Sequence, residues 1–352
     1  MKTTLLEKKL SNSKPNAFIC YNTEHVLTSL ILSYYSHDKN YIYICNRFSN
    51  YRDITRKINN NFACVRQAMA IDDNKLKEIS TQNIFSQIIK LLFYKKYLKN
   101  IFHKKVYIRP LKLSDIFMYN DGQFLSQYIV THYDNLNLIE EGIGNYANIK
   151  LNFASLLKKM HGIYPPYGCN PKIKNIFVKR PQDLPQRVRK KGSYFNKSKY
   201  INVIPADLSR LIIKTFLNQK KFKPTLQNSA LLITQPFSED LVIKEEKKKS
   251  LYREIIDKLN QKYRVYIKPH PREKTDYSFL KTKAEEVYDH TFPVEIINYV
   301  EEVDFDIAVT LSSSAIERIK PEVKTYKLGD ILSDKEKYFK KIKKNLNKIT
   351  KS

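Results

Sequence analysis

Short apolar runs alternate with longer stretches of helical periodicity along most of this 352-residue chain. The apolar runs have the length and β-branched character of buried strands, and between them apolar residues recur every three or four positions, as on one face of a helix. In the first half, the predicted helices are 24–35 and 83–102, and the predicted strands are 17–21, 41–45, 62–65, 106–108 and 137–139. This order predicts a parallel sheet with helices on both faces, because parallel neighbours need crossover connections.

The same alternation resumes in the second half of the chain. Here we predict helices at 250–259, 294–300 and 313–319, and strands at 230–234, 264–267, 307–310 and 324–328. A length of 352 residues also favours two domains over one. We therefore predict two doubly wound α/β domains, the first in residues 1–200 and the second in residues 201–330.

Prolines and basic residues interrupt the pattern between the two halves. Prolines recur at positions 165, 166, 171, 181 and 185, followed by the run RVRKKG, so we interpret 165–200 as an irregular basic connector. Residues 171–230 carry 15 Lys and Arg but only two acids, Asp183 and Asp207. This stretch is a candidate surface for an anionic ligand.

Residues 331–352 form a basic tail, which we predict to be an amphipathic helix. Four apolar residues fall on one helical face: Phe339, Ile342, Leu346 and Ile349. Such a helix can pack on its own domain with solvated lysines, or it can lie on an anionic lipid surface. The sequence leaves both alternatives open.

The charge balance limits the partners of this chain. Lys and Arg number 63 against 35 Asp and Glu, a net charge of +28, which favours a polyanion such as nucleic acid, an acidic membrane face or an acidic polymer. Nucleic-acid binding is the least favoured, because the sequence has no helix-turn-helix, zinc or RNA-binding signature.

Several absences predict a cytoplasmic protein. The four cysteines form no CxxC pair, and Cys20 and Cys45 lie in apolar runs, so we expect free thiols in a reducing compartment. No stretch approaches the roughly 18 apolar residues of a membrane span, and the first residues lack the apolar core of a secretory signal. The histidines show no metal-ligand spacing, so we expect no metal.

Two adjacent acids, Glu140 and Glu141, follow the predicted strand 137–139 and precede Gly142 and Gly144. In open α/β sheets, ligands bind beyond the carboxyl ends of the strands, where a carboxylate can act as general base toward a hydroxyl. The glycines let the backbone approach a substrate closely. The alternative is an ordinary turn with solvated acids.

A histidine fixed between two prolines ends the predicted strand 264–267. His270 lies between Pro269 and Pro271, with Lys268 before them and Arg272 after. The prolines restrict the backbone on both sides of the histidine. A cationic setting suits a phosphate-bearing ligand, to which the imidazole can donate a proton or a hydrogen bond.

Three serines, Ser312, Ser313 and Ser314, lie between the predicted strand 307–310 and the following helix. Hydroxyls and amides in such a place can bind a phosphate, or they can simply cap the helix. Two weaker candidates are Gln235, after the strand 230–234, and Glu295, which begins a helix and could bind a ribose or favour the helix dipole.

Together these motifs resemble those of bacterial sialyltransferases, which share an acidic pair followed by Gly, a His-Pro and a later serine pair. The resemblance is closest to the capsular polysialyltransferases of Gram-negative bacteria, which carry segments similar to LIEEG-x-G-x-Y, IKPHP-[KR]-E and LTS-x-S. Lipooligosaccharide sialyltransferases are looser relatives. In this chain the matching order and spacing cover residues 136–316.

The resemblance implies a GT-B fold, in which two Rossmann-like domains face a central cleft. It implies an inverting, metal-independent reaction without a cofactor, in which CMP-sialic acid is bound mainly by the C-terminal domain. His270 would bind or protonate the CMP phosphate, and one acid of the pair would deprotonate the acceptor, with Glu141 slightly favoured over Glu140. The implied donor contacts are Lys268, Ser312, Ser313 and Ser314. From their positions in the sequence we also predict donor contacts at Pro269, Pro271, Gln235 and Glu295.

The charge favours an acceptor that is itself an anionic polysialic or oligosialic chain. We therefore predict acceptor contacts at Gly142, Gly144, Asn145, Arg187, Arg189, Lys190 and Lys191. The alternatives are transfer of one sialic acid to a galactose-terminated lipooligosaccharide or capsule repeat, or use of another nucleotide sugar. The resemblance also implies peripheral attachment to the cytoplasmic face of the anionic inner membrane, with capsule assembly proteins as partners.

Overall fold

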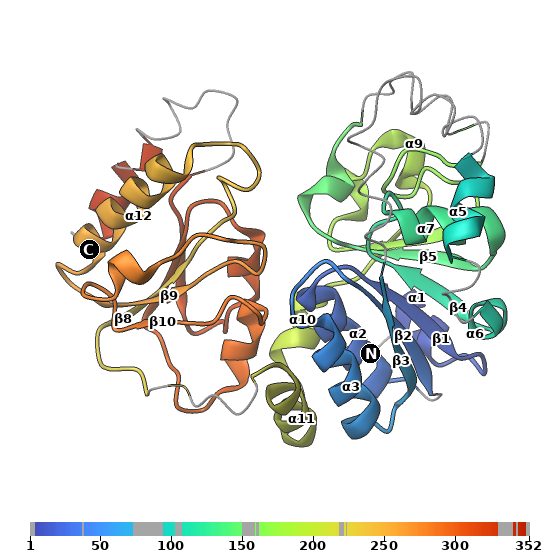
Figure 1. The fold of residues 1–352 in the computed structure, drawn as a ribbon, viewed down its shortest axis with the longest axis horizontal. Helices are drawn as coiled ribbons and strands as arrows, with labels where there is room; N and C mark the ends of the chain where they lie inside the picture. Colours follow the sequence, from blue (N-terminus) through green and yellow to red (C-terminus); the bar gives the residue numbers. More distant parts are fainter. Residues whose placement is uncertain are drawn as a thin grey trace. The chain divides into compact units, whose positions relative to one another are not determined.

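A computed structural model describes residues 4–36, 39–72, 94–102, 108–149, 159, 162–217, 222, 224–329, 341–342 and 344–349. The chain forms two compact units, Met1–Tyr200 and Ile201–Ser352. Each unit is an α/β layer structure built around one parallel sheet (Figure 1).

The sheet of unit 1 has seven strands among the described residues, in the order β3-β2-β1-β4-β5-β6-β7. Every neighbouring pair in it is parallel. The direction of winding therefore changes between β1 and β4. The strands are β1 (Asn16–Cys20), β2 (Asn40–Cys45), β3 (Val65–Ile71), β4 (Asp115–Met118), β5 (Leu136–Ile139), β6 (Ile173–Val178) and β7 (Gly192–Tyr194).

The burial of these strands follows their place in the sheet. Every residue of β1 and β2 is buried, as expected for apolar strands covered by helices on both faces, whereas the edge strand β3 has both buried and exposed positions. Helix α2 (Thr23–Tyr34) packs on β1 and β2, and α3 (Tyr51–Asn61) packs on β2 and β3. The other helices of unit 1 are α1 (Leu5–Leu10), α5 (Tyr94–Phe102), α6 (Ile108–Leu113), α7 (Phe124–His132), α9 (Gln186–Arg189) and α10 (Lys197–Asn202), the last continuing into unit 2.

Unit 2 has a parallel sheet in the order β10-β9-β8-β11-β12. Its change of winding lies between β8 and β11. Its longer helices are α11 (Ala206–Phe216) and α12 (Glu245–Leu259), and short 3-10 turns lie at Ser278–Leu280, Val294–Tyr299 and Ser314–Arg318. The strands are β8 (Ser229–Ile233), β9 (Arg264–Lys268), β10 (Glu286–Val287), β11 (Ile307–Thr310) and β12 (Lys324–Lys327).

The described part of the C-terminal tail is helical and packs on unit 2. Ile342, Leu346 and Ile349 are each at most 2% exposed and belong to the same apolar core as Leu251 and Ile255 of α12. This segment lies alongside α12 in Figure 1. The packing alternative therefore accounts for the apolar face, and these three side chains are not available to a lipid surface. Phe339 lies outside the described residues.

Most predicted strands are confirmed to within one or two residues, but one is wrong, because the run 62–65 ends where β3 begins, at Val65. Of the predicted strand 106–108, only Ile108 is among the described residues, and it begins α6. Strand β4 was not predicted. The predicted helix 83–102 is described only from Tyr94, where it coincides with α5, and its first part lies outside the described residues.

The prediction of an irregular connector at 165–200 is wrong. The segment contributes β6 and β7 to the sheet of unit 1, and α9 lies between them. Its prolines lie at the boundaries of these elements: Pro181 begins a 3-10 turn and Pro185 is the N-cap of α9. These elements are only three to six residues long, and the prolines between them are closely spaced. The segment therefore shows no clear hydrophobic periodicity in the sequence.

Two further observations concern the cysteines and the helices. All four cysteines are free thiols, and Cys20 and Cys45 are buried, as predicted. Among the residues that the structure describes, no helix has the length and apolar character that crossing a bilayer requires.

Candidate functional site

In unit 1, polar side chains gather where β1, β4 and β5 end, at the change of winding. Glu141 follows β5, and its Oε2 accepts hydrogen bonds from Asn120 Nδ2 at 2.7 Å and from the Tyr167 hydroxyl at 3.5 Å. The side chain of Glu141 is 28% exposed, so the carboxylate is partly open to a ligand. Burial raises the pKa of Glu141 and the nearby Glu24 raises it further, while the Asn120 hydrogen bond and Lys197 oppose them.

The adjacent acid, Glu140, is directed to a different neighbour. Its Oε2 accepts a hydrogen bond from the backbone N–H of Lys179, which follows β6, at 2.6 Å. The Tyr146 hydroxyl also lies against this carboxylate, and burial together with Glu140 raises the pKa of Tyr146 to about 12. Glu140 therefore joins the ends of β5 and β6, whereas Glu141 lies at the change of winding.

Asn145 holds the loop that carries both acids. Its Oδ1 accepts hydrogen bonds from the N–H groups of Glu141 at 3.0 Å and Gly142 at 3.2 Å, and the residue is fully buried. We therefore replace the predicted acceptor contact at Asn145 with a positioning role. Gly144 leaves room for Tyr167, because a Cβ there would lie 2.5 Å from the Tyr167 hydroxyl oxygen and the ring would have to shift.

Tyr167, which contacts Glu141, is fixed by a second buried acid. Asp121 accepts hydrogen bonds from the backbone N–H groups of Tyr167 and Gly168, the latter at 3.0 Å. Burial raises the pKa of Asp121 to about 6, despite the opposing effect of these hydrogen bonds. Asn120 and Asp121 are site residues that the sequence analysis missed, because β4 was not recognised as the strand before them.

His25 is a further residue of this site, to which the sequence analysis assigned no role. It is fully buried, its Nε2 lies 3.9 Å from Glu141 Oε1, and its ring stacks on Tyr119 with centroids 4.2 Å apart. Its Nδ1 accepts the backbone N–H of Tyr21 at 3.2 Å. The preceding Glu24 forms an ion pair with Lys197 at 2.8 Å. Glu24 and His25 follow β1, so the rule that identified Glu140 and Glu141, position after the carboxyl end of a strand, would also have identified them.

In unit 2, His270 follows β9 and Pro269. Its Nδ1 accepts the backbone N–H of Arg272 at 3.1 Å, which leaves Nε2 as the nitrogen that carries the proton in the neutral ring. Burial, with the nearby charges of Arg272 and Lys268, lowers the pKa of His270 to about 3. The free protein therefore holds a neutral imidazole that can donate one hydrogen bond.

Glu273 fixes the backbone of this histidine from inside the unit. Its Oε2 accepts the N–H of His270 at 2.7 Å and the hydroxyl of Thr234, and its Oε1 accepts the hydroxyl of Tyr277 at 2.8 Å. Lys248 of α12 neutralises this carboxylate at 2.6 Å. The side chains of Lys248 and Glu273 are at most 1% exposed.

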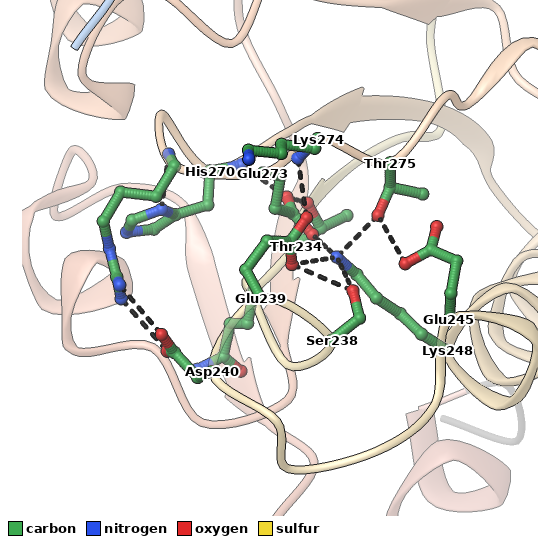
Figure 2. A network of polar contacts seen from close by, with 12 residues as sticks. Thr234, Ser238, Glu239, Asp240, Glu245, Lys248, His270, Glu273, Lys274 and Thr275 are labelled. Atoms are coloured by element: carbon green, nitrogen blue, oxygen red, sulfur yellow. Dashed lines mark hydrogen bonds and ion pairs between the residues drawn. The ribbon is translucent and has the colours of Figure 1, made fainter. Parts of the chain in front are cut away.

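Lys248 is the centre of the polar network that Figure 2 shows. Besides Glu273, its ammonium contacts Glu239 at 3.0 Å and the hydroxyl of Thr275 at 2.7 Å. Burial acts to raise the pKa of Glu239, but the hydrogen bonds from the Lys274 N–H and Lys248 outweigh it and lower the pKa to about 2.

Arg272 pairs with Asp240 through both terminal nitrogens, at 2.8 and 3.0 Å. The segment around His270 is thus held from β8, α12 and the loop between them. The sequence analysis missed Lys248 and Glu273.

Lys268 supports the loop from the inside instead of facing an open site. It is 1% exposed, donates to the carbonyl of Pro269 at 2.7 Å and lies 4.3 Å from the centre of the Phe292 ring. Burial lowers the pKa of Lys268 to about 7, although nearby acids oppose the shift. Its predicted contact with a donor phosphate is replaced by contact with the backbone that carries His270.

The ends of β8 and β11 are joined by Gln235. Its Oε1 accepts the backbone N–H of Ser312 at 2.7 Å and the Ser312 hydroxyl at 3.2 Å. The Ser313 hydroxyl caps the following 3-10 turn by accepting the N–H of Ala315 at 3.2 Å. Ser314 is the first residue of that turn.

Glu295, the predicted ribose contact, is 1% exposed and forms an ion pair with Arg318. Both residues belong to unit 2, in the turns after β10 and β11. The carboxylate is therefore neutralised within the unit.

Four basic residues predicted to contact the acceptor precede β7 instead of following a strand: Arg187, Arg189, Lys190 and Lys191. The Lys191 ammonium donates to the carbonyls of Gly168 at 2.8 Å and Asn170 at 2.7 Å. Arg189 donates to the carbonyl of Leu184 at 3.0 Å, and Arg187 to that of Ile149 at 3.1 Å. Three of these side chains are thus bound to backbone within unit 1.

The described residues offer no group of three or more His, Cys, Asp or Glu side chains that could hold a metal ion.

Comparison with known proteins identifies a family and a fold. The model of glycosyltransferase family 52 matches residues 37–328. An uncharacterized protein from Haemophilus influenzae (strain Rd) is 31% identical over 208 residues, which make up 59% of this chain and 66% of that protein, slightly under two thirds of its length.

Two solved structures have a similar architecture. An α/β-galactoside α-2,3-sialyltransferase from Photobacterium phosphoreum has a TM-score of 0.50 at 11% identity, with 96% of each chain covered. The GT-B domain of a sialyltransferase from Photobacterium damselae has a TM-score of 0.49 at 11% identity, covering 96% of this chain and 97% of that one. The first likeness, together with the two parallel sheets, confirms the predicted GT-B fold.

Replacing Lys248 with Met tests the network around His270. The substitution leaves the buried carboxylate of Glu273 without its cation, so we expect a loss of about 3 kcal/mol or more in the free energy of unfolding of unit 2. Adding Glu273→Gln should recover part of this loss, because it removes the unpaired charge. Chemical denaturation measures the free energy of unfolding of the single and the double variant. The control is Lys247→Met, which replaces an exposed lysine of the same helix. Equal stabilities of Lys248→Met and Lys247→Met would contradict this account.

Proposed function

The chain belongs to glycosyltransferase family 52, and we propose that it is an inverting sialyltransferase that uses CMP-sialic acid as its donor. The observation that carries the proposal is the presence in one chain of two chemically different centres, each at the carboxyl ends of the strands of its own parallel sheet. Unit 1 offers a partly exposed carboxylate with a raised pKa, Glu141, and unit 2 offers a neutral imidazole in a cationic loop, His270. These are the two groups that transfer from a sugar phosphate to a hydroxyl needs.

Glu141 is proposed as the general base. It would accept the proton of the acceptor hydroxyl while the hydroxyl oxygen forms a bond to the anomeric carbon of the sialic acid. A raised pKa makes the carboxylate a stronger base, provided that it remains ionised at the working pH. Attack on the face opposite to the leaving phosphate gives inversion.

His270 is proposed to assist the leaving group. As the bond between the anomeric carbon and the phosphate oxygen breaks, the electron pair remains on CMP, and a hydrogen bond from Nε2 stabilises the added charge. The hydrogen bond from the Arg272 N–H to Nδ1 sets this tautomer, and the hydrogen bond from the His270 N–H to Glu273 fixes the backbone. In this scheme the chain's own side chains stabilise the leaving charge, and we propose that no metal takes part.

The finer proposal is that the acceptor is the growing end of a polysialic acid chain. A net charge of +28 supports it, because each sugar of this polymer carries one carboxylate and a basic surface would attract it. The alternative acceptor is a galactose-terminated lipooligosaccharide or capsule repeat. The two differ in products, since a polymerase extends an oligosialic primer by several residues.

Nucleotide selectivity combined with turnover tests the proposal. We expect CMP to raise the melting temperature of the protein, and UDP and GDP to leave it unchanged, because the donor is a CMP sugar. Incubation with CMP-sialic acid and either acceptor should release CMP and give a sialylated product, detected by mass spectrometry. Stabilisation by UDP or GDP instead of CMP, with no transfer to any acceptor, would sink the proposal.

Replacing Asn120 with Ala tests the assignment of the base. The substitution removes a hydrogen bond that lowers the pKa of Glu141, so that pKa should rise further. Because the base works only when deprotonated, the acidic limb of the kcat/KM profile should move to higher pH. The control is Asn61→Ala, whose side chain bonds only within α3 among the described contacts. An acidic limb at the same pH in both variants would show that Glu141 does not set it.

A further inference from the structure

We propose that the carboxyl ends of β6 and β7 form a subsite for a carboxylate-bearing sugar of the acceptor, with Arg180 as its anion-binding group. This inference rests on the proposed function and assigns its acceptor to particular residues. It replaces Arg187, Arg189, Lys190 and Lys191, which precede β7 and of which three are bound to backbone carbonyls. Arg180, by contrast, follows the carboxyl end of its strand, as Glu141 does.

The backbone before Arg180 is tied to the acidic pair. The N–H of Lys179 donates to Glu140 Oε2 at 2.6 Å, and the N–H of Arg180 donates to the Tyr146 hydroxyl at 3.3 Å. The Arg180 guanidinium lies over the Tyr146 ring, 4.7 Å from its centre. Arg180 is therefore anchored beside Glu140, one residue away from the proposed base.

The guanidinium can exchange its present partner for a ligand. Its side chain is 54% exposed, and its ion pair with Asp183, itself 45% exposed, has an Nε–Oδ2 distance of 3.4 Å. Exposed pairs of this kind contribute about 0–1 kcal/mol, which a two-pronged contact with a ligand carboxylate readily exceeds. Tyr146 covers one face of the guanidinium and leaves its edge for such a ligand.

Two exposed apolar side chains belong to segments at the same edge of the sheet as Arg180. Tyr194 ends β7, pairs in register with Val178 and is 58% exposed, and Ile143, which follows Gly142, is 67% exposed. An exposed aromatic ring such as Tyr194 can support the apolar face of a ligand ring. A sugar that carries a carboxylate offers both features, an apolar ring face and an anion.

The strand spacing suits one sugar residue. Neighbouring strands lie about 4.8 Å apart, so β5, which precedes Glu141, and β7, which ends at Tyr194, are separated by roughly 10 Å, with β6 between them. A terminal sugar whose carboxylate contacts Arg180 could therefore present a hydroxyl toward Glu141. A neutral terminal galactose would leave Arg180 without a function in binding.

Acceptor kinetics with Arg180→Gln test this subsite. We expect KM for an oligosialic acceptor to rise about 10-fold or more, because a charged hydrogen-bonded contact is lost, while kcat changes little. Arg180→Lys keeps the positive charge but loses the planar guanidinium, so its KM should lie between those of the wild type and Arg180→Gln. The control is Arg210→Gln on α11, an exposed arginine whose Nε donates to the carbonyl of Ala206 in its own helix.

Direct binding separates failure of this inference from failure of the proposed function. Titration calorimetry with oligosialic acid, and with an oligogalacturonic acid of equal charge, requires no turnover. Weaker binding of oligosialic acid to Arg180→Gln than to Arg210→Gln supports the subsite even if no transfer is detected. The oligogalacturonic acid shows whether the subsite binds any sugar that carries a carboxylate. The inference is overturned if the wild type binds neither ligand, or if both variants bind them like the wild type.

Discussion

Parallel strand pairing is the constraint on which the rest of this structure depends. Every strand pair in the described residues is parallel, so all carboxyl ends of one sheet meet at one edge. Segments distant in sequence are thereby brought together: Asn120 follows β4 and bonds to Glu141, which follows β5. In unit 2 the same rule brings Gln235 against Ser312. The candidate site residues of each unit lie in the loops at that edge, where open α/β sheets bind their ligands.

Buried polar contacts then decide what each loop residue can do. Glu140 and Glu141 are adjacent and chemically identical, yet one is hydrogen-bonded to the end of β6 and the other lies among groups from β1 and β4. The two units use different means to hold their loops. Unit 1 uses the amide of Asn145 and the carboxylate of Asp121 on backbone N–H groups, whereas unit 2 relies on the ion pair of Lys248 with Glu273. Such pairs favour one loop conformation at a cost in desolvation.

The strands that are buried on both faces could be predicted from the sequence, and so could the acids and the histidine that follow them. The strands β1, β2, β8 and β11 are apolar except for one polar residue at an end, which identifies them without knowledge of their neighbours. Strand β4 was missed although it is as long as β5 and β11, which were predicted, and β7 offers no apolar run because Tyr194 is its single apolar side chain. Lys248 could not be identified either, since it lies on a helix of many lysines and only the fold shows which one is buried. For the same reason, the density of basic residues before β7 could not reveal that their charged groups bind backbone carbonyls.

The central claim, that Glu141 and not Glu140 is the base, is tested most directly by comparing the two isosteric variants. Single-turnover transfer from CMP-sialic acid should fall by about 100-fold or more in Glu141→Gln, because the acceptor proton then has no base to receive it. Glu140→Gln should retain most of the rate, since its carboxylate is bonded to the Lys179 backbone. A greater loss in Glu140→Gln than in Glu141→Gln would contradict the account.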